Sequence, residues 1–186
     1  MREKLLQSSK GEKKITRFAQ NAGLLAVLFF TLAGCMQVWH PGSVPDLSLD
    51  KVGALSGGYS VALVNDQREM RPQPVIGNAH VNYNEWTEFF INYYANELRK
   101  RGVNVDPGSP NKILVKLDGF TVQQGFAKMR ANIHFRFSTS DGRIIKEMYE
   151  TDTSGMSAGR AFAGVIYHTA EKLLTDREVL DRMKGY

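Results

Sequence analysis

The side chain with the clearest chemical potential is Cys35, the only cysteine in the chain. A single thiol cannot form a disulfide within one chain, so its chemistry must be of another kind. Three residues, Leu32, Ala33 and Gly34, precede it, at the end of an apolar stretch that begins at Ala22. Upstream lies a basic segment that contains Arg2, Lys4, Lys10, Lys13, Lys14 and Arg17. This order of basic, apolar and small residues is typical of a secretory signal.

A membrane-spanning helix that ends at Cys35 is the other interpretation of the apolar stretch. Residues 22–32 are 11 in number, whereas a helix that spans a bilayer needs about 20. Pro41, Gly42 and Pro45 follow soon after and do not continue a helix. The sequence therefore favours a signal over a transmembrane helix.

The four residues Leu32-Ala33-Gly34-Cys35 resemble the lipobox of bacterial lipoproteins. This resemblance implies a signal peptide over residues 1–34 that is cut between Gly34 and Cys35. It also implies that Cys35 carries diacylglycerol and an amide-linked acyl chain such as palmitate. Met36 is not aspartate, which in this class implies the outer membrane, with the protein at its periplasmic face.

The charge of the chain belongs mostly to this signal. The net charge is +5 in total, and residues 1–20 hold six Lys or Arg and two Asp or Glu. After residue 34 the chain has 18 basic and 17 acidic residues. A nucleic-acid-binding domain normally keeps a strong basic patch. The sequence therefore predicts no nucleic-acid partner.

Catalytic and metal-binding patterns give no support for an enzyme. The sequence contains no P-loop, no G-x-G-x-x-G and no H-E-x-x-H. Its four histidines are scattered, and the carboxylate pairs Glu85/Glu88 and Glu147/Glu150 do not resemble an acid–base dyad. We expect no catalytic residues, no metal and no cofactor.

Residues 35–58 are rich in glycine and proline, and they predict a lipidated N-terminus followed by a flexible tether. Residues 59–186 predict a single α+β periplasmic domain. The expected strands cover 59–64, 103–105, 112–123, 127–138 and 143–153, with helices at 84–101 and from 158. A long loop is expected at 65–82, in which Val75-Ile76 could form a short edge strand. This order predicts a two-layer sandwich, a mostly antiparallel sheet with two helices packed on one face.

The predicted helix 84–101 has an unusually wide apolar arc. Its aromatic and aliphatic residues spread over about two thirds of the circumference, more than one sheet face can cover. Two interpretations stay open: a long loop also packs on this helix, or the surplus aromatics contact a partner. In the second case, Trp86 and Tyr94 are the expected exposed contact residues, while Glu88, Asn92, Asn96 and Arg99 face water.

The strand predicted at 127–138 alternates apolar residues with a polar row. The apolar side is expected under the helices, and the polar side carries Lys128, Arg130, His134 and Arg136. This row could bind anionic headgroups or an acidic partner. Alternatively, it is an exposed sheet face with cross-strand pairs to residues such as Glu147 and Asp118.

Short segments resemble a further group of proteins. They are Val61-Ala62-Leu63-Val64, the helix end Leu98-Arg99-Lys100-Arg101-Gly102-Val103, the turn Asp141-Gly142-Arg143 and Ala170-Glu171-Lys172-Leu173-Leu174-Thr175-Asp176. Over residues 58–182 they are similar to small envelope lipoproteins of the YajG type and, more loosely, to auxiliary lipoproteins of ABC transport systems. The resemblance implies an α+β periplasmic domain without enzyme activity.

Two functions are compatible with these observations. The first is a non-enzymatic, membrane-anchored envelope lipoprotein that acts through protein contacts in envelope assembly or transport. The second is a lipoprotein that binds a lipid or another small ligand in a pocket between the helices and the sheet. A partner surface predicts exposed aromatics on the helix, whereas a carrier predicts an enclosed apolar cavity.

Overall fold

The computed structural model describes residues 36–55, 58–155 and 157–185. The chain has a compact unit, Gln37–Tyr186, which we call the domain and which is distinct from Met1–Met36. Within the described residues, no helix is both long enough and apolar enough to cross a membrane. The expected signal and the lipidation site, Gly34 and Cys35, lie outside the described residues.

The domain is built on a five-stranded sheet, as the α+β prediction requires. In spatial order its strands are β5 (Asn104–Val105), β2 (Ser60–Asn65), β6 (Lys112–Gly125), β7 (Lys128–Thr139) and β8 (Ile144–Ser154). The long strands β6, β7 and β8 form an antiparallel meander, while β2 is parallel to both of its neighbours. The β7–β8 turn contains Asp141 and Gly142, whose φ of 86° suits a tight hairpin.

A second, three-stranded sheet corrects the expectation of a long loop at 65–82. Its strands are β1 (Gln37–Trp39), β4 (Ala79–Val81) and β3 (Gln73–Ile76), in that order. Pro74 lies within β3, where the register with β4 shifts between Pro74 and Ile76. This is the edge position in which a strand tolerates a proline. The short strands hold Val81 in the core.

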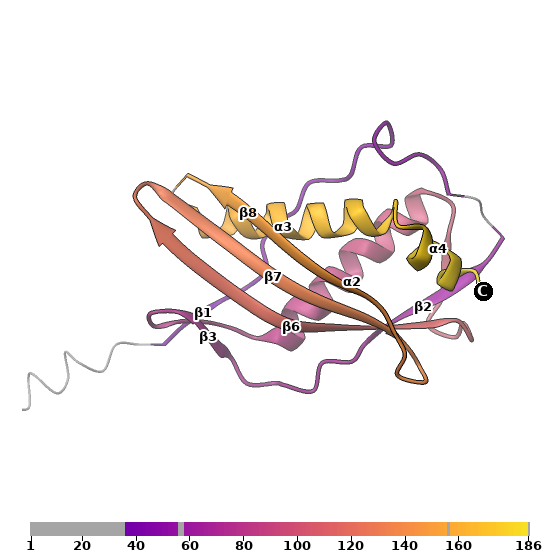
Figure 1. Ribbon diagram of the computed structural model, residues 1–186, viewed down its shortest axis with the longest axis horizontal. Coiled ribbons are helices and arrows are strands. Elements are labelled where there is room, and N and C mark those ends of the chain that lie inside the picture. Colours follow the sequence, from indigo (N-terminus) through magenta and orange to yellow (C-terminus); the bar gives the residue numbers. More distant parts are fainter. Residues whose placement is uncertain (1–35, 56–57, 156, 186) are drawn as a thin grey trace, which may run out of the picture. The chain divides into compact units, whose positions relative to one another are not determined.

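Three helices lie against one face of the five-stranded sheet (Figure 1). They are α2 (Tyr83–Lys100), α3 (Ala158–Leu173) and α4 (Arg177–Met183), and they begin after the capping residues Asn82, Ser157 and Asp176. After α2, Gly102 adopts a φ of 91°, the left-handed conformation that glycine tolerates at a helix end. The residues expected to be buried on α3, from Phe162 to Leu173, are buried.

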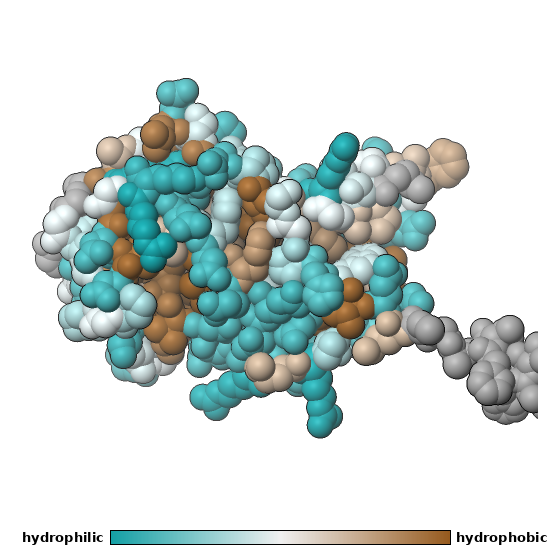
Figure 2. Space-filling model, turned by 180° about the vertical axis from the view of Figure 1, so that it is seen from behind, coloured by the Kyte–Doolittle hydropathy of each residue, from teal (hydrophilic) through white to brown (hydrophobic). Residues whose placement is uncertain are grey.

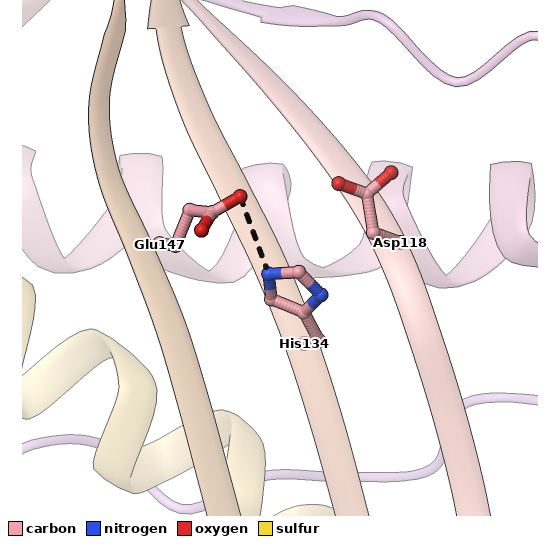
Figure 3. A group of neighbouring side chains, drawn as sticks. All are labelled: Asp118, His134 and Glu147. Carbon is pink, nitrogen blue, oxygen red and sulfur yellow. Dashed lines mark ion pairs between the residues drawn. The ribbon is translucent and has the colours of Figure 1, made fainter.

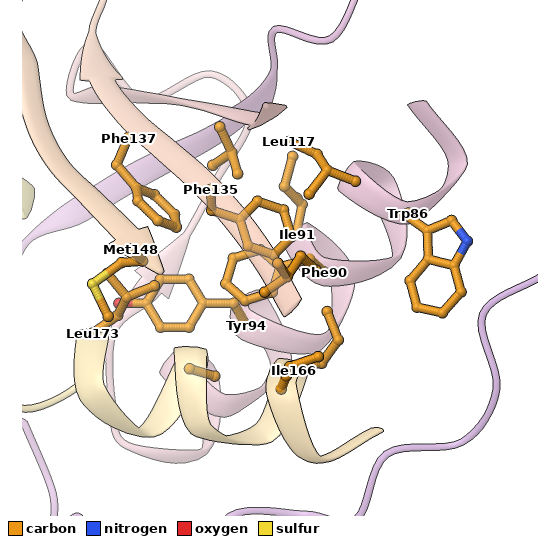
Figure 4. Close-up of a cluster of buried hydrophobic side chains, with 14 of the residues drawn as sticks. Trp86, Phe90, Ile91, Tyr94, Leu117, Phe135, Phe137, Met148, Ile166 and Leu173 are labelled. Carbon is orange, nitrogen blue, oxygen red and sulfur yellow. The ribbon is translucent and has the colours of Figure 1, made fainter. Parts of the chain in front are cut away.

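The core fills the space between the sheet and the helices (Figure 4). The inward row of β7 contributes Phe135 and Phe137, and α2 contributes Phe90, whose ring lies 4.4 Å from that of Phe135 between centroids. The predicted alternation of this strand is therefore confirmed. Viewed from behind, the surface is mostly hydrophilic, with hydrophobic residues in separate patches (Figure 2).

The expectation of a flexible tether is wrong for residues 37–55, which lie against the domain and which we call the strap. Leu47 and Val52 of the strap are buried. Trp86 Nε1 donates to Trp39 O at 3.1 Å, and the Tyr93 hydroxyl donates to Pro45 O at 2.8 Å. The strap therefore covers the part of the wide apolar arc that the sheet leaves open. Of the two interpretations of that arc, the packing of a long loop is confirmed.

Arg101, directly after α2, holds the next part of the strap. Its side chain is fully buried and forms an ion pair with Glu97, with 2.6 Å between Nη1 and Oε2. Its Nε donates to Val52 O at 3.0 Å and its Nη2 to Leu47 O at 3.1 Å. One side chain thus satisfies a buried carboxylate and two strap carbonyls that would otherwise lack donors.

Phe135→Ala tests the orientation of β7. Phe135 is fully buried, so its truncation should cost about 3–5 kcal/mol in the free energy of unfolding. Arg130→Ala changes an exposed side chain of the same strand, and it should shift that free energy by less than about 0.5 kcal/mol. Urea unfolding of both variants measures the difference. Equal losses would contradict the register described here.

Arg101→Leu tests the clamp on the strap. The variant leaves Glu97 buried with one of its two cationic partners removed, and it should cost about 3 kcal/mol. Lys100→Leu is the comparison, since Lys100 pairs with Glu97 and with Asp46 of the strap but is exposed, so its loss should cost less than about 1 kcal/mol. Urea unfolding again gives both values. A loss no greater in Arg101→Leu than in Lys100→Leu would show that the clamp is unimportant for stability.

Candidate functional site

Trp86 and Tyr94, the expected contact residues on α2, are not on the surface. Trp86 is 1% exposed and packs against Phe120 and Phe162, with ring centroids 4.9 and 5.2 Å away. Tyr94 is fully buried, and this burial raises the pKa of its hydroxyl. The prediction that they are exposed is wrong, because the strap and the sheet together cover both sides of the helix. The expected polar arc, with Glu88, Asn92, Asn96 and Arg99, does face water.

The sheet face opposite the helices carries a cluster of ionisable side chains. Asp118, His134 and Glu147 come from the three neighbouring strands β6, β7 and β8, and they lie on the side away from the helices (Figure 3). Together with Lys116, Arg136 and Tyr149 we call them the outer face. The register explains the grouping, because Arg136 pairs with both Lys116 and Glu147, and His134 pairs with Tyr149.

A β-bulge brings Asp118 into this group. The register between β6 and β7 shifts between Leu117 and Gly119, so Asp118 is the extra residue of β6. Bulges commonly redirect a side chain where pairing is locally interrupted. Here Leu117 stays in the core and is buried, while the carboxylate of Asp118 turns toward Arg136 on the opposite face.

Arg136 links the carboxylates of the outer face. Its Nη2 lies 2.8 Å from Asp118 Oδ2, and its Nε lies 3.3 Å from Glu147 Oε1. Lys116 Nζ adds a second cation to Asp118 at 2.9 Å. These are the cross-strand pairs expected for an exposed sheet face, and the prediction is confirmed for His134 and Arg136. Within this network the positive charges of Arg136 and Lys116 balance the negative charges of Asp118 and Glu147.

The same cluster has the residue types of a metal site, but its geometry is that of an ion-pair network. The ligand atoms of Asp118, His134 and Glu147 lie within 4.8 Å of one another, a spacing that does not by itself distinguish a metal site from a set of ion pairs. Arg136 occupies both carboxylates, and His134 Nε2 lies 3.8 Å from Glu147. A cation would have to displace the guanidinium, so we assign no metal to this cluster.

Tyr149 gives the outer face an accessible aromatic surface. Its ring stacks on His134 with 3.9 Å between centroids and an interplanar angle of 13°, while the residue remains 67% exposed. Beyond Arg136 the face continues into an open hollow of about 780 Å³, lined by the 66–69 loop and the β7–β8 hairpin. Tyr149 was not among the residues expected at a functional site, although the outward alternation of Glu147, Tyr149 and Thr151 on one strand is a signal that could have identified it.

Ser157 is the central residue of Gly155–Gly159, a segment that matches the G-x-S-x-G pattern of serine hydrolases. The expectation that the sequence contains no catalytic motif is wrong at this position, since it overlooked this match. In the structure Ser157 caps α3, and its hydroxyl accepts a hydrogen bond from Arg160 N at 3.3 Å. Within the described residues, His40 is hydrogen-bonded to Glu85, His80 to Asn78 O and His168 to Glu171, while the ring of His134 stacks on Tyr149. Ser157 therefore has the role of a helix cap.

Known proteins offer only distant likenesses. No protein-family model and no curated protein matches this sequence. Among solved structures, the chain is similar to the lipoprotein GNA1162 from Neisseria meningitidis, at 10% identity and a TM-score of 0.34, over 63% of this chain and 99% of that one. It is also similar to the hypothetical protein CT253 from Chlamydia trachomatis, at 11% identity and a TM-score of 0.33, over 69% and 96%. Such low TM-scores carry no conclusion about activity or partners.

Proposed function

We propose that this chain is a lipid-anchored protein of the bacterial envelope, held at the periplasmic face of the outer membrane through Cys35. The observation that carries the proposal is the order of residues before that cysteine: a basic segment, a short apolar stretch and Leu32-Ala33-Gly34-Cys35. Two or more acyl chains would anchor the protein stably, because each buried CH₂ contributes about 0.8 kcal/mol.

The domain acts through protein contact rather than catalysis, in envelope assembly or transport. Tyr149 and Arg136, at the centre of the outer face, belong to the residue types that contribute most to binding at protein interfaces. The outer face ends at β8, which pairs only with β7 among the described strands. The unpaired edge of such a strand can accept a strand from a partner.

The alternative, a carrier with a ligand pocket between helices and sheet, is not favoured. The space enclosed by the strap, α2 and α3 near Trp86 and Phe162 amounts to about 10 Å³. Such a volume holds one water molecule at most. The hollow beside the outer face is larger but open, and charged residues such as Lys116 and Arg136 line it.

Cys35→Ser tests the anchor. The variant should accumulate as an uncleaved precursor without acyl mass on residue 35, because serine offers no thiol for the lipid. Intact-mass spectrometry of the protein from the envelope fraction measures both properties, with the unchanged chain as control. Normal cleavage together with full membrane retention in the variant would contradict the lipoprotein proposal.

Tyr149→Ser tests the contact surface. The mature lipidated protein, cross-linked in intact cells and purified from solubilised envelope, should lose its cross-linked partner in this variant, because the exposed ring is the apolar centre of the outer face. Asn96→Ser is the control, a change to the same residue type at an exposed position of α2. Circular dichroism should show an unchanged fold in both. Equal retention of the partner by Tyr149→Ser would exclude the outer face as the contact surface.

A further inference from the structure

The docked strap holds Gln37, which follows Cys35 by two residues in the sequence, on the body of the domain. Gln37 is the first residue of β1, which pairs with β4, and its N–H donates to Asn78 O at 3.0 Å. Cys35 precedes Gln37 by two residues, and two residues span at most about 7 Å. A flexible tether of twenty residues would leave the domain free to turn. With the strap docked and Cys35 anchored in the bilayer as proposed, the end of the domain that carries Gln37 lies close to the membrane.

The turn between β6 and β7 is at this same end. In Figure 1 the β3–β4 turn, against which Gln37 is bonded, and the β6–β7 turn lie at one end of the domain, and the β7–β8 turn lies at the other. The β6–β7 turn presents Phe126, which is 101% exposed, the most exposed of the large apolar residues described. An aromatic side chain at such a position suits the boundary between headgroups and acyl chains.

The charges at the β6–β7 turn are positive and uncompensated. Lys128 and Arg130 are exposed on β7, and neither takes part in an ion pair within the described part of the chain. Further along the same polar row, His134 and Arg136 are paired with carboxylates. The sequence has no acidic residue between Asp118 and Asp141. Basic residues near a membrane surface are attracted by anionic lipids.

We propose that the β6–β7 turn is a second membrane contact, in which Phe126 enters the headgroup region while Lys128 and Arg130 bind anionic lipid phosphates. The proposal rests on the proposed anchor at Cys35, which brings this end of the domain to the bilayer. The contact fixes the orientation of the domain. The β7–β8 turn and the adjoining hollow then point away from the membrane, where a partner can reach them.

Because Cys35 is the only cysteine, its acylation leaves no reactive thiol, and an added cysteine can be labelled alone. Gln124→Cys places a fluorescent thiol probe beside Phe126, and Ser140→Cys places it at the β7–β8 turn. Both positions are exposed. The mature lipidated proteins are reconstituted into vesicles of phosphatidylcholine with phosphatidylglycerol that contain a spin-labelled lipid. The quenching of the probe at residue 124 should be several-fold stronger than at residue 140.

Two further changes, made with the probe at residue 124, identify the groups responsible. Phe126→Ser should remove most of the difference in quenching, whereas Met70→Ser, which changes an exposed apolar residue elsewhere, should leave it intact. Omitting phosphatidylglycerol should weaken the quenching, and Lys128→Gln with Arg130→Gln should abolish this dependence on the lipid charge.

The outcomes separate this inference from the proposed function. Equal quenching at residues 124 and 140, in protein whose intact mass shows acylated Cys35, overturns the membrane contact and leaves the anchor standing. The β6–β7 turn would then be free or covered by a protein. Labelling of the unchanged chain by the thiol probe would show an unmodified Cys35 and would overturn both proposals.

Discussion

The arrangement of the domain depends on one buried guanidinium. Arg101 lies where α2 ends, and its donors satisfy Glu97 and the carbonyls of Leu47 and Val52 at once. A buried charge is tolerated only with a partner and with its remaining hydrogen bonds made, and strap carbonyls outside any sheet need donors of their own. The guanidinium of Arg101 supplies the donors that the strap carbonyls need, and Glu97 and these carbonyls supply the acceptors that the guanidinium needs. The strap in turn covers the second face of α2, and its first residues form β1, where pairing with β4 places Gln37.

Most of the α+β fold could be predicted from periodicity, because the elements of the main sheet and its helices each bury one face. The alternation in β7 and the spacing on α3 identified the inward residues, and Asn82 and Gly102 marked the ends of α2. The strap could not be predicted in this way. Side chains of the domain hold the strap by donating hydrogen bonds to its backbone carbonyls. Every residue has such a carbonyl, so the sequence does not show which carbonyls accept. The excess width of the apolar arc on α2 was the only signal, and it allowed two interpretations.

The cross-strand ion pairs of the outer face could be predicted from the sequence, but the full set of residues that form this face could not. The polar row of β7 implied partners on the neighbouring strands, and Arg136 has them in Asp118 and Glu147. The bulge that places Asp118 there depends on a register shift between two strands, which a single strand's pattern cannot reveal. Trp86 and Tyr94 were misplaced for the opposite reason: their residue types suit an interface and a core equally well, and only tertiary packing decides between the two.

The position of the two tryptophans has an optical consequence. Trp39 belongs to the strap and Trp86 to α2, and they meet where Trp86 Nε1 donates to Trp39 O and where both rings face Phe162. The chain contains no other tryptophan. All of its indole emission therefore arises at the seam between strap and helix. The wavelength of that emission reports whether the strap is seated, so the natural chain carries its own spectroscopic sensor for this contact, without any label.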